Sequence, residues 1–537
     1  MWADRIGDAG SDAGWAVTTD NSGNIYTTGF FNGTVDFDPG AGTMNLTSNG
    51  VEDIFLSKMG TSGNLLWAKG FGGAGSDHGF SVAADATGNV YVTGAFVGTV
   101  DFDPGPGTLN LTSGSTYGDM FILKLDPSGN LLWAKQFGGS GGISGYSIAI
   151  NNSGEVHATG SFTGTIDFDP GPGSDNLTST GSYDIFVCKL SSGGGLIWAK
   201  QMGGNTGFED NVSNAITVDA AGAVYTTGAY EDTTDFDPGI GYYPLDSTGF
   251  FVSKLDASGN FVWAKKIVSP NVMGNAMTID PAGNLLIAGS FSYAADFDTG
   301  PASYIEDAGV DRDIFILKIT ASGNFIWMKQ MGSPDGGDYA YAIETDALGN
   351  VYSAGSFQDT ADMDPGIGTF DLTSNGMDDI FVSKLDPGGN FICAAQIGGT
   401  EVDYAYALTL DASNNIYLTG AFMNSVDFDP GAGTTAYSSA GDEDMFLMAV
   451  SDCSFATTIA ESGKKAIKLF PDPAADHISI EGWSANMTME IYSSLGEKIN
   501  ITAKGNFTDV TTLPSGVYFV RILDGKQIFT ERFCKAR

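Results

Sequence analysis

Residues 81–105 read SVAADATGNVYVTGAFVGTVDFDPG, and this stretch contains most of the signals that decide the fold. Two runs rich in β-branched and aromatic residues flank the turn at 85–89, which predicts a β-hairpin over 81–96. A short third strand over 99–103 ends at Pro104, because proline lacks the N–H that a central ladder needs. Residues 119–135, DMFILKLDPSGNLLWAK, predict a second hairpin around Asp-Pro-Ser-Gly-Asn.

The same pattern recurs along the chain. Asp-Phe-Asp-Pro-Gly, or a close variant of it, begins at Asp36, Asp101, Asp167, Asp235, Asp296, Asp362 and Asp427. The spacings lie between 61 and 68 residues, so the chain holds seven copies of one unit. No window has a sustained helical period. Four to five antiparallel strands per unit, without helices, predict an all-β fold and a seven-bladed β-propeller, with a straight β-solenoid as the alternative.

The two ends of the repeat array favour the propeller. The N-terminal segment Trp2–Gly7 matches the motif Leu-Trp-Ala-Lys that ends the other units, whereas the last unit stops at Val450 without it. We therefore expect the N-terminal strand to complete the last blade, which hides sheet edges that would otherwise aggregate. The predicted propeller covers residues 1–455, followed by a linker over 456–466 and a small β-sandwich over 467–537.

Two stretches carry a family resemblance. SDHGFSVAADATGNVYVTGAF at 76–96 and DYAYAIETDALGNVYSAGSF at 338–357 resemble the SBBP-type β-propeller repeat. That family is defined by fold and not by activity, so the resemblance implies architecture only.

Composition excludes several classes of function. The 537 residues include 64 acids and only 24 bases, a net charge of -40, and so acidic a surface repels nucleic acids and anionic membranes. Hydrophobic residues make up 42%, which is enough for a core despite 75 glycines. No apolar run is long enough for a transmembrane helix. The three histidines and four cysteines are too scattered to predict a zinc site or a His-based triad.

The cysteines support only modest expectations. Cys188 and Cys393 lie in apolar runs and are expected to be small buried hydrophobic residues. A Cys453–Cys534 disulfide would be consistent with an oxidising compartment.

The C-terminal segment differs from the rest in charge. From Lys464 onward it has 10 Lys and Arg against 8 Asp and Glu, which leaves 14 bases and 56 acids, a net charge of -42, for the propeller. Strand-like runs at 477–480, 489–492, 516–522 and 527–533 predict a small antiparallel sandwich. So different a charge balance indicates that the two domains have different roles.

This segment resembles the C-terminal sorting domain of type IX secretion, the Bacteroidota route across the outer membrane. The matching motifs are Leu-Phe-Pro-Asp-Pro at 469–473, Ile-Tyr-Ser-Ser-Leu-Gly at 491–496 and Leu-Pro-Ser-Gly-Val-Tyr-Phe-Val at 513–520. Their key residues are Pro471, Pro473, Gly496, Pro514, Gly516 and Tyr518. Asp472 departs from the Asn that is usual in the family.

The resemblance implies recognition by the type IX translocon, cleavage by its C-terminal signal peptidase, and a secreted or surface-attached product. Residues 1–4 are no signal peptide, since a basic segment and an apolar core are missing. Because such cargo first enters the periplasm, we expect the natural chain to begin upstream of Met1 or its start to have been misassigned.

The paired aspartates of the repeated pentapeptide are the strongest chemical signal. Alternate strand residues share a face, so both carboxylates project together, as oxygen ligands of Ca²⁺ would. The favoured interpretation is a structural turn with a solvated acidic rim, and Ca²⁺ in some blades is the alternative. Seven similar copies argue against a unique catalytic pair. The candidate calcium ligands are Asp36, Asp38, Asp101, Asp103, Asp167, Asp169, Asp235, Asp237, Asp362, Asp364, Asp427 and Asp429, and Asp298 lies in the one variant that lacks the proline.

Positions at which the repeats differ are more informative for function, because every blade has the same scaffold requirements. One equivalent position, expected at the mouth of the ring, holds Trp15, Phe80, Tyr146, Asn214, Asn275, Tyr341 and Tyr406. These residues form either a binding platform or aromatic filler between blades. Irregular loops at 241–244 and 302–313, the latter with Arg312, are a further candidate partner site.

The sequence thus predicts a secreted or surface-attached propeller that acts as a non-enzymatic binding or adhesion module for a surface glycan or protein. An extracellular polysaccharide hydrolase or lyase and a structural surface-layer component remain alternatives, because fold alone does not decide function.

Overall fold

The computed structural model describes residues 1–204, 211–269, 271–431, 433–450, 468–470, 474, 476–481, 487–493, 498–499, 507–514, 516–524 and 527–535. These residues are all-β: strands, turns and loops, with no helix in the ranges described. The chain divides into two compact units, Met1–Thr457 and Thr458–Arg537. The candidate linker at 456–466, Cys453, Pro471, Pro473 and Gly496 lie outside the described residues.

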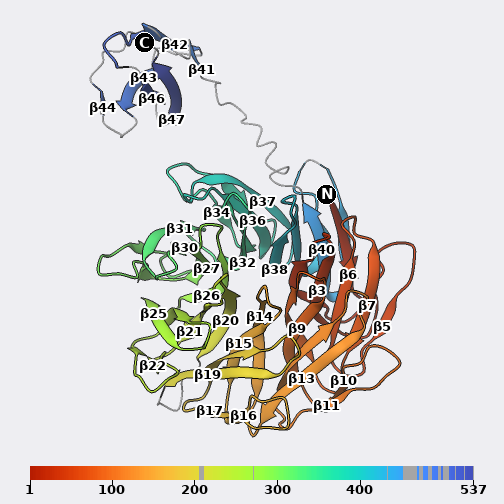
Figure 1. Cartoon of the computed structure of the whole chain (residues 1–537). Coiled ribbons are helices and arrows are strands. Elements are labelled where there is room, and N and C mark those ends of the chain that lie inside the picture. The colour runs from red at the N-terminus through yellow and green to blue at the C-terminus, as the bar shows by residue number, and fades with distance from the viewer. Residues whose placement is uncertain are drawn as a thin grey trace. The chain divides into compact units, whose positions relative to one another are not determined.

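Each repeat of the first unit is a four-stranded antiparallel meander (Figure 1). The first strands are β2 (Ala13–Thr19), β8 (His78–Ala84), β14 (Ile143–Ile150), β20 (Val212–Val218), β26 (Met273–Ile279), β32 (Tyr339–Thr345) and β38 (Asp403–Leu410). The second strands are β3 (Ile25–Phe31), β9 (Val90–Phe96), β15 (Val156–Phe162), β21 (Val224–Tyr230), β27 (Leu285–Phe291), β33 (Val351–Phe357) and β39 (Ile416–Asp427).

The third and fourth strands form the second predicted hairpin. The third strands are β6 (Asp53–Met59), β12 (Asp119–Leu125), β18 (Asp184–Leu190), β24 (Gly249–Leu255), β30 (Asp313–Ile319), β36 (Asp379–Leu385) and β40 (Ala436–Val450). The fourth strands are β7 (Leu65–Phe71), β13 (Leu131–Gly139), β19 (Leu196–Gly204), β25 (Phe261–Val268), β31 (Phe325–Met331), β37 (Phe391–Gly399) and, for the last repeat, β1 (Trp2–Ile6).

The predicted pairing of the two ends is present. β1 lies antiparallel to β40, with Trp2 opposite Ala449 and Ile6 opposite Met445. Each first strand contacts the first strand of the next repeat, and β38 contacts β2. In Figure 1 these strands follow one another around a common centre.

A short outer hairpin follows the second strand in each repeat, and its second strand was not predicted. The pairs are β4 (Thr34–Asp36) with β5 (Asn45–Thr47), β10 (Thr99–Asp101) with β11 (Asn110–Thr112), β16 (Thr165–Asp167) with β17 (Asn176–Thr178), β22 (Thr234–Asp235) with β23 (Pro244–Leu245), β28 (Ala294–Asp296) with β29 (Ile305–Asp307), and β34 (Thr360–Asp362) with β35 (Asp371–Thr373). In the last repeat the ends of β39 and β40 pair in the same way.

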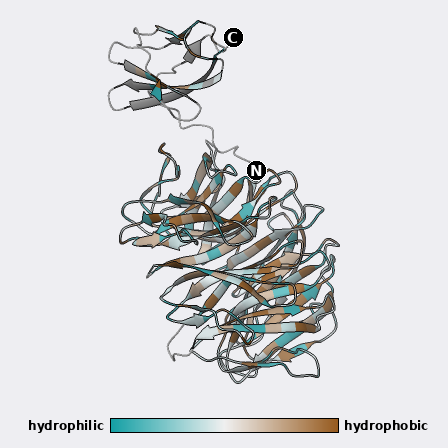
Figure 2. Cartoon of the chain, turned by 60° about the vertical axis from the view of Figure 1, so that its left-hand side comes forward, coloured by the Kyte–Doolittle hydropathy of each residue, from teal (hydrophilic) through white to brown (hydrophobic). Residues whose placement is uncertain are grey.

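Hydrophobic side chains from neighbouring repeats form the core. Third strands such as β12, with the sequence DMFILKL, are buried along their whole length because both faces pack against other sheets. Figure 2 shows hydrophobic residues interspersed with hydrophilic ones along the strands. The tryptophan of the fourth strand reaches the next repeat, where Trp67 Nε1 donates a hydrogen bond to the Pro127 carbonyl at 3.2 Å. A packing role for this repeated tryptophan was predicted from the sequence.

The cysteines differ in part from expectation. Cys188 is free and fully buried, as predicted. Cys393 is buried in the hydrophobic core, as predicted, but it is also disulfide-bonded, which the prediction did not include. It occupies the place that tryptophan holds in the preceding repeats.

The second unit contains two antiparallel sheets. One consists of β41 (Lys468–Phe470), β42 (His477–Glu481) and β45 (Phe507–Asp509), and the other of β43 (Met487–Ser493), β44 (Lys498–Ile499), β46 (Gly516–Asp524) and β47 (Gln527–Lys535). Ile478 of the first sheet and Ile491 and Val520 of the second share one buried core, as expected of a small sandwich. Tyr518 donates its hydroxyl to the Pro514 carbonyl at 2.9 Å, so two of the sorting-motif residues are joined directly.

Buried aspartates line the junctions between repeats. The backbone N–H of Asp77 donates to the Glu52 carbonyl of the preceding repeat at 2.8 Å. The Asp77 carboxylate accepts hydrogen bonds from the Gly73 and Val97 N–H groups. Asp12, Asp338 and Asp403 occupy equivalent places, and all four residues are at most 1% exposed.

A second aspartate from the neighbouring third strand faces each of these four. The pairs are Asp53 with Asp77, Asp444 with Asp12, Asp313 with Asp338, and Asp379 with Asp403. The Oδ1 atoms of Asp53, Asp313, Asp379 and Asp444 are buried without a hydrogen-bond partner. Burial raises the pKa of Asp12, Asp338 and Asp403 to about 7 and that of Asp53 and Asp313 to about 6. Each pair therefore favours a protonated carboxyl, whose O–H can supply the missing hydrogen bond.

These shifts predict the pH dependence of stability. The folded pKa values lie above that of an unfolded aspartate, so the folded state binds more protons between about pH 4 and pH 7. The free energy of unfolding therefore falls as pH rises through this window. At pH 8 the Asp53→Asn variant, which mimics the protonated form, is expected to unfold about 1–2 °C above the wild type, and the difference should shrink as pH falls through 5 and nearly vanish only near pH 4.

Asp119→Asn is the matched control. Asp119 is equivalent to Asp53 and shares its unpartnered Oδ1 and a pKa raised by burial, but Ile143 stands where Asp77 would be, so the comparison isolates the effect of the second carboxylate. Thermal unfolding of both variants from about pH 4 to pH 8 checks the prediction. A lower unfolding temperature of Asp53→Asn at pH 8 would contradict it.

Candidate functional site

The seven candidate ligand-binding residues occupy one structural position. Each pair of first and second strands has a register shift, which falls between Gly14 and Ala16 in the first repeat. Such a bulge leaves one residue outside the ladder and redirects its side chain. The residues at the seven shifts are the predicted ones, Trp15, Phe80, Tyr146, Asn214, Asn275, Tyr341 and Tyr406. We call them the bulge residues. All seven are partly buried.

The bulge residues contact their neighbours in consecutive repeats. Trp15 stacks on Phe80 with ring centroids 5.2 Å apart, and Phe80 lies 5.3 Å from Tyr146. Tyr341 and Tyr406 lie 5.8 Å apart, edge to face. Much of their aromatic surface thus packs between repeats, which fits the filler interpretation, while each side chain keeps an exposed part.

The two asparagines tie neighbouring first strands together. Asn214 Nδ2 donates to the Gly274 carbonyl at 3.2 Å, and Asn275 Nδ2 donates to the Ala340 carbonyl at 2.9 Å. Their amides replace aromatic packing by hydrogen bonds across two junctions. These side chains therefore have a structural role.

A second row of side chains accompanies the bulge residues. Tyr339 stacks on Tyr341 at 5.9 Å, Tyr404 stacks on Tyr406 at 5.7 Å, and the Arg312 guanidinium lies 5.6 Å from the Tyr339 ring centroid. Arg312, predicted as part of a partner site, thus reaches this face. Two tyrosines of the irregular loops pack elsewhere: Tyr243 lies against Phe261 and Tyr304 against Phe325, both in fourth strands.

Tyr341, Tyr404 and Tyr406 of this face are neutral at physiological pH. Burial raises the pKa of Tyr341 and Tyr406, and it raises that of Tyr404 to about 12. Burial also raises the pKa of Asp378, although Gln358 Nε2 donates to its carboxylate at 3.2 Å. The phenols can therefore stack and donate hydrogen bonds, but none is activated as a base.

The paired aspartates of the pentapeptides have a defined structural role. Asp101 Oδ1 accepts hydrogen bonds from the N–H groups of Asp103 and Leu109, at 3.0 and 2.7 Å, and Asp103 Oδ1 accepts one from Gly105. The intervening Phe102 is fully buried, as expected. The same pattern recurs in every repeat, including the variant around Asp296 and Asp298. Within the described ranges, no cluster of three or more His, Cys, Asp or Glu side chains is suited to a metal ion.

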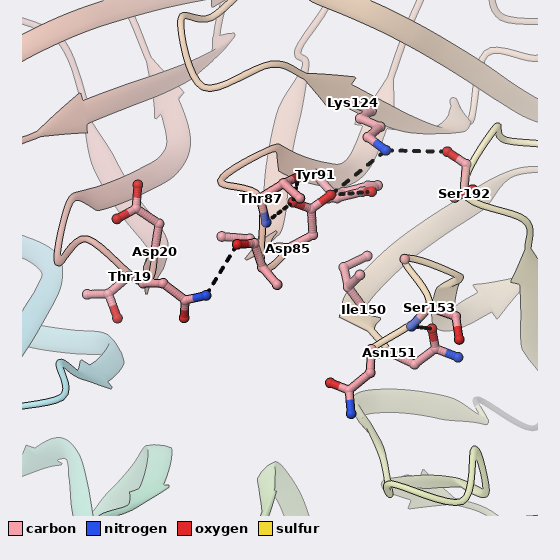
Figure 3. Close-up of a pocket in the computed structure, with 15 residues that line it drawn as sticks. Thr19, Asp20, Asp85, Thr87, Tyr91, Lys124, Ile150, Asn151, Ser153 and Ser192 are labelled. Atoms are coloured by element: carbon pink, nitrogen blue, oxygen red, sulfur yellow. Dashed lines mark hydrogen bonds and ion pairs between the residues drawn. The ribbon is translucent and has the colours of Figure 1, made fainter.

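A cavity of about 500 Å³ opens among the turns that follow β2, β8 and β14 (Figure 3). Asp85 accepts a hydrogen bond from the Tyr91 hydroxyl at 3.0 Å, and Lys124 Nζ lies 3.9 Å from the same oxygen. Burial opposes ionisation of Asp85, but hydrogen bonds from Thr87 and Asn89 outweigh it and lower its pKa to about 2. The polar groups of this cavity satisfy one another, which indicates a structural role.

The sequence interpretation missed two exposed tyrosines on the same face as Tyr146. Tyr117 and Tyr183 line a pocket with Tyr146, and they are 76% and 38% exposed. The signal was present in the sequence, because the loop before Asp119 is one residue longer than the equivalent loop before Asp53.

Comparisons with known proteins identify the C-terminal segment. Residues 468–536 match the secretion system C-terminal sorting domain. This match implies export of a secreted or surface protein by type IX secretion. No helix in the described part of the chain has the length and hydropathy to cross a membrane.

The remaining similarities are distant. An uncharacterized WD repeat-containing protein L264 of Acanthamoeba polyphaga mimivirus is 23% identical over 79% of this chain and 36% of its own length. The regulatory protein FlaEY of Caulobacter vibrioides is 25% identical over 26% of this chain and 14% of its own. The chain thus covers little more than a third of the length of the mimivirus protein. The crystal structure of Sqt1 from Chaetomium thermophilum aligns with a TM-score of 0.39 and 9% identity, over 84% of this chain and 98% of Sqt1.

Because the pentapeptide carboxylates cap their own loops, millimolar Ca²⁺ is expected to leave the unfolding temperature of the chain unchanged relative to chelator. Both samples need matched high ionic strength, since any cation screens so acidic a surface. A Ca²⁺-specific rise of a few degrees would contradict this and support the alternative, because a site saturated at 100 times its Kd contributes about 2.7 kcal/mol.

Proposed function

We propose that the chain is a type IX cargo whose residues 1–455 form a closed seven-bladed β-propeller of SBBP-type repeats, acting outside the cell as a non-enzymatic binding module. The pairing of β1 with β40 and the contact of β38 with β2 support closure of the ring. In this proposal residues 456–466 are a linker, and residues 467–537 are recognised by the translocon and removed by its C-terminal signal peptidase.

The observation that carries the binding role is the set of bulge residues on one face. Five are aromatic and two are asparagines, although the scaffold requirements of the repeats are the same. Bulge side chains are free of the ladder, so they vary without disturbing the sheet. Aromatic side chains that keep exposed parts offer stacking surfaces, and their phenols offer hydrogen bonds.

A surface glycan is the ligand class that this face fits best. The propeller has a net charge of -42, so an anionic partner would be repelled. The tyrosines of the face are neutral and can donate hydrogen bonds to hydroxyl groups. We therefore expect a neutral glycan, with a protein ligand as the alternative outcome.

The chain is expected to retain neutral glycans on an array and to release no products from any polysaccharide in a degradation screen. Tyr341→Ala should weaken retention, whereas Leu66→Ala on the fourth strand β7, where the side chain is 48% exposed, is the matched control. Release of degradation products would contradict the non-enzymatic role and favour a hydrolase or lyase.

Residues 464–537, fused behind a reporter with a signal peptide, should deliver that reporter to the cell surface of a host with type IX secretion. Surface labelling and fractionation measure the outcome, with an established cargo as the positive control. Retention of the reporter in the periplasm would count against the sorting role.

A further inference from the structure

A separate pocket of about 230 Å³ lies on the third repeat. Tyr117 and Tyr183 come from the loops before β12 and β18, on either side of the first strand β14, and Tyr146 is the bulge residue of β14 itself. Ser144 and Ser161 add hydroxyl groups to the lining. The pocket therefore combines aromatic rings from three segments with several neutral hydrogen-bonding groups.

Backbone contacts fix both exposed tyrosines. The Tyr183 carbonyl accepts hydrogen bonds from the Asn211 N–H at 3.4 Å and from Asn211 Nδ2 at 3.3 Å. Tyr117 lies so close to Gly142 that a Cβ added there would come within 2.6 Å of the Tyr117 Cβ. These contacts fix the backbone at both tyrosines, so only their side chains have to be ordered when a ligand binds.

The charges found at other junctions are missing here. In four repeats a charged residue directly precedes the buried aspartate that begins the third strand, namely Glu52, Arg312, Asp378 or Glu443. At this pocket the residues in that position are Gly118 and Tyr183. At the two junctions beside this pocket, Ile143 and Asn211 stand where other repeats have the buried aspartate equivalent to Asp77. Among the residues that the structure describes, no charged side chain lines the pocket. Within a domain of net charge -42, this described lining is neutral and partly aromatic.

We propose that this pocket binds a single neutral sugar ring at the end of a glycan. The C–H face of a pyranose packs on tyrosine rings, and its hydroxyls exchange hydrogen bonds with phenol and serine hydroxyls. The volume is below that of pockets for drug-sized ligands, which limits the ligand to about one ring. The inference rests on the proposed binding function and gives it a defined site.

The experiment uses the full chain and measures binding of methyl glycosides of glucose, galactose, mannose and N-acetylglucosamine by NMR saturation transfer. At least one is expected to bind, and methyl galacturonate should bind at least tenfold more weakly than methyl galactoside.

Tyr117→Ala combined with Tyr183→Ala should reduce binding at least tenfold, while Tyr183→Phe, which keeps the ring, should retain most of it. Tyr242→Ala, at a residue that is 66% exposed in an outer hairpin, is the matched control and should have no effect.

The outcomes separate this pocket from the wider proposal. Glycan retention on the array that is unchanged in the double alanine variant would overturn the pocket and leave the proposed function standing. Preference for the uronate, or for N-acetylphenylalanine amide as a peptide-like probe, would overturn the assignment to a neutral sugar. Failure of the wild type to bind any glycan would overturn both. Equal unfolding temperatures of the variants establish that a loss of binding is local.

Discussion

A hydrogen bond between the backbones of neighbouring repeats, present at six of the seven junctions, is the interaction on which the rest of the structure depends. The donor is the backbone N–H of the residue just before, or at the start of, a first strand. The acceptor is the carbonyl of the residue just before the third strand of the preceding repeat, as from Asp77 to Glu52 and from Asp403 to Asp378. Strand pairing holds a four-stranded sheet together but does not hold one sheet to another. The junction bond fixes that spacing, and the buried carboxylates around it satisfy the N–H groups of the adjoining turns. Because a buried N–H without a partner is costly, an aspartate is retained there despite its desolvation penalty.

This arrangement explains why so acidic a chain folds. Many of its carboxylates are held by hydrogen bonds or burial: pentapeptide aspartates cap outer hairpins, turn aspartates such as Asp85 bind their own backbone, and burial raises the pKa of junction aspartates such as Asp12. Hydrogen bonds from backbone N–H groups thus compensate part of the electrostatic cost of so many acids. The repeated acids are largely structural, which is why the search for a site turns to positions at which the repeats differ.

Much of the fold could be predicted from the sequence, because its signals are local or periodic. Turn residues located the hairpins, the repeat spacing located the sheets, and the similarity of Trp2–Gly7 to the other fourth strands located the pairing of β1 with β40. The candidate site was predicted only in part. Equivalence of Trp15 and Tyr341 was visible, but the bulge that sets them outside the ladder depends on register and has no sequence signature here. The β11-type strands, at three residues, are too short to give a periodic signal. The disulfide of Cys393 depends on a contact between distant parts of the chain, which spacing alone does not reveal.

The same reasoning explains why the third repeat differs from its neighbours. Two carboxylates buried at one junction each have a desolvation cost and repel one another, so loss of one lowers the cost of retaining the other. At the junction between the fourth and fifth repeats both aspartates are absent, and Gly249 and Val272 stand in their places. At each of the two junctions beside β14 one aspartate of the pair is absent, and Ile143 or Asn211 takes its place. The exposed Tyr117 and Tyr183 lie beside these two residues. Relief of buried charge explains Ile143 and Asn211, and the tyrosines beside them supply the aromatic part of the proposed pocket.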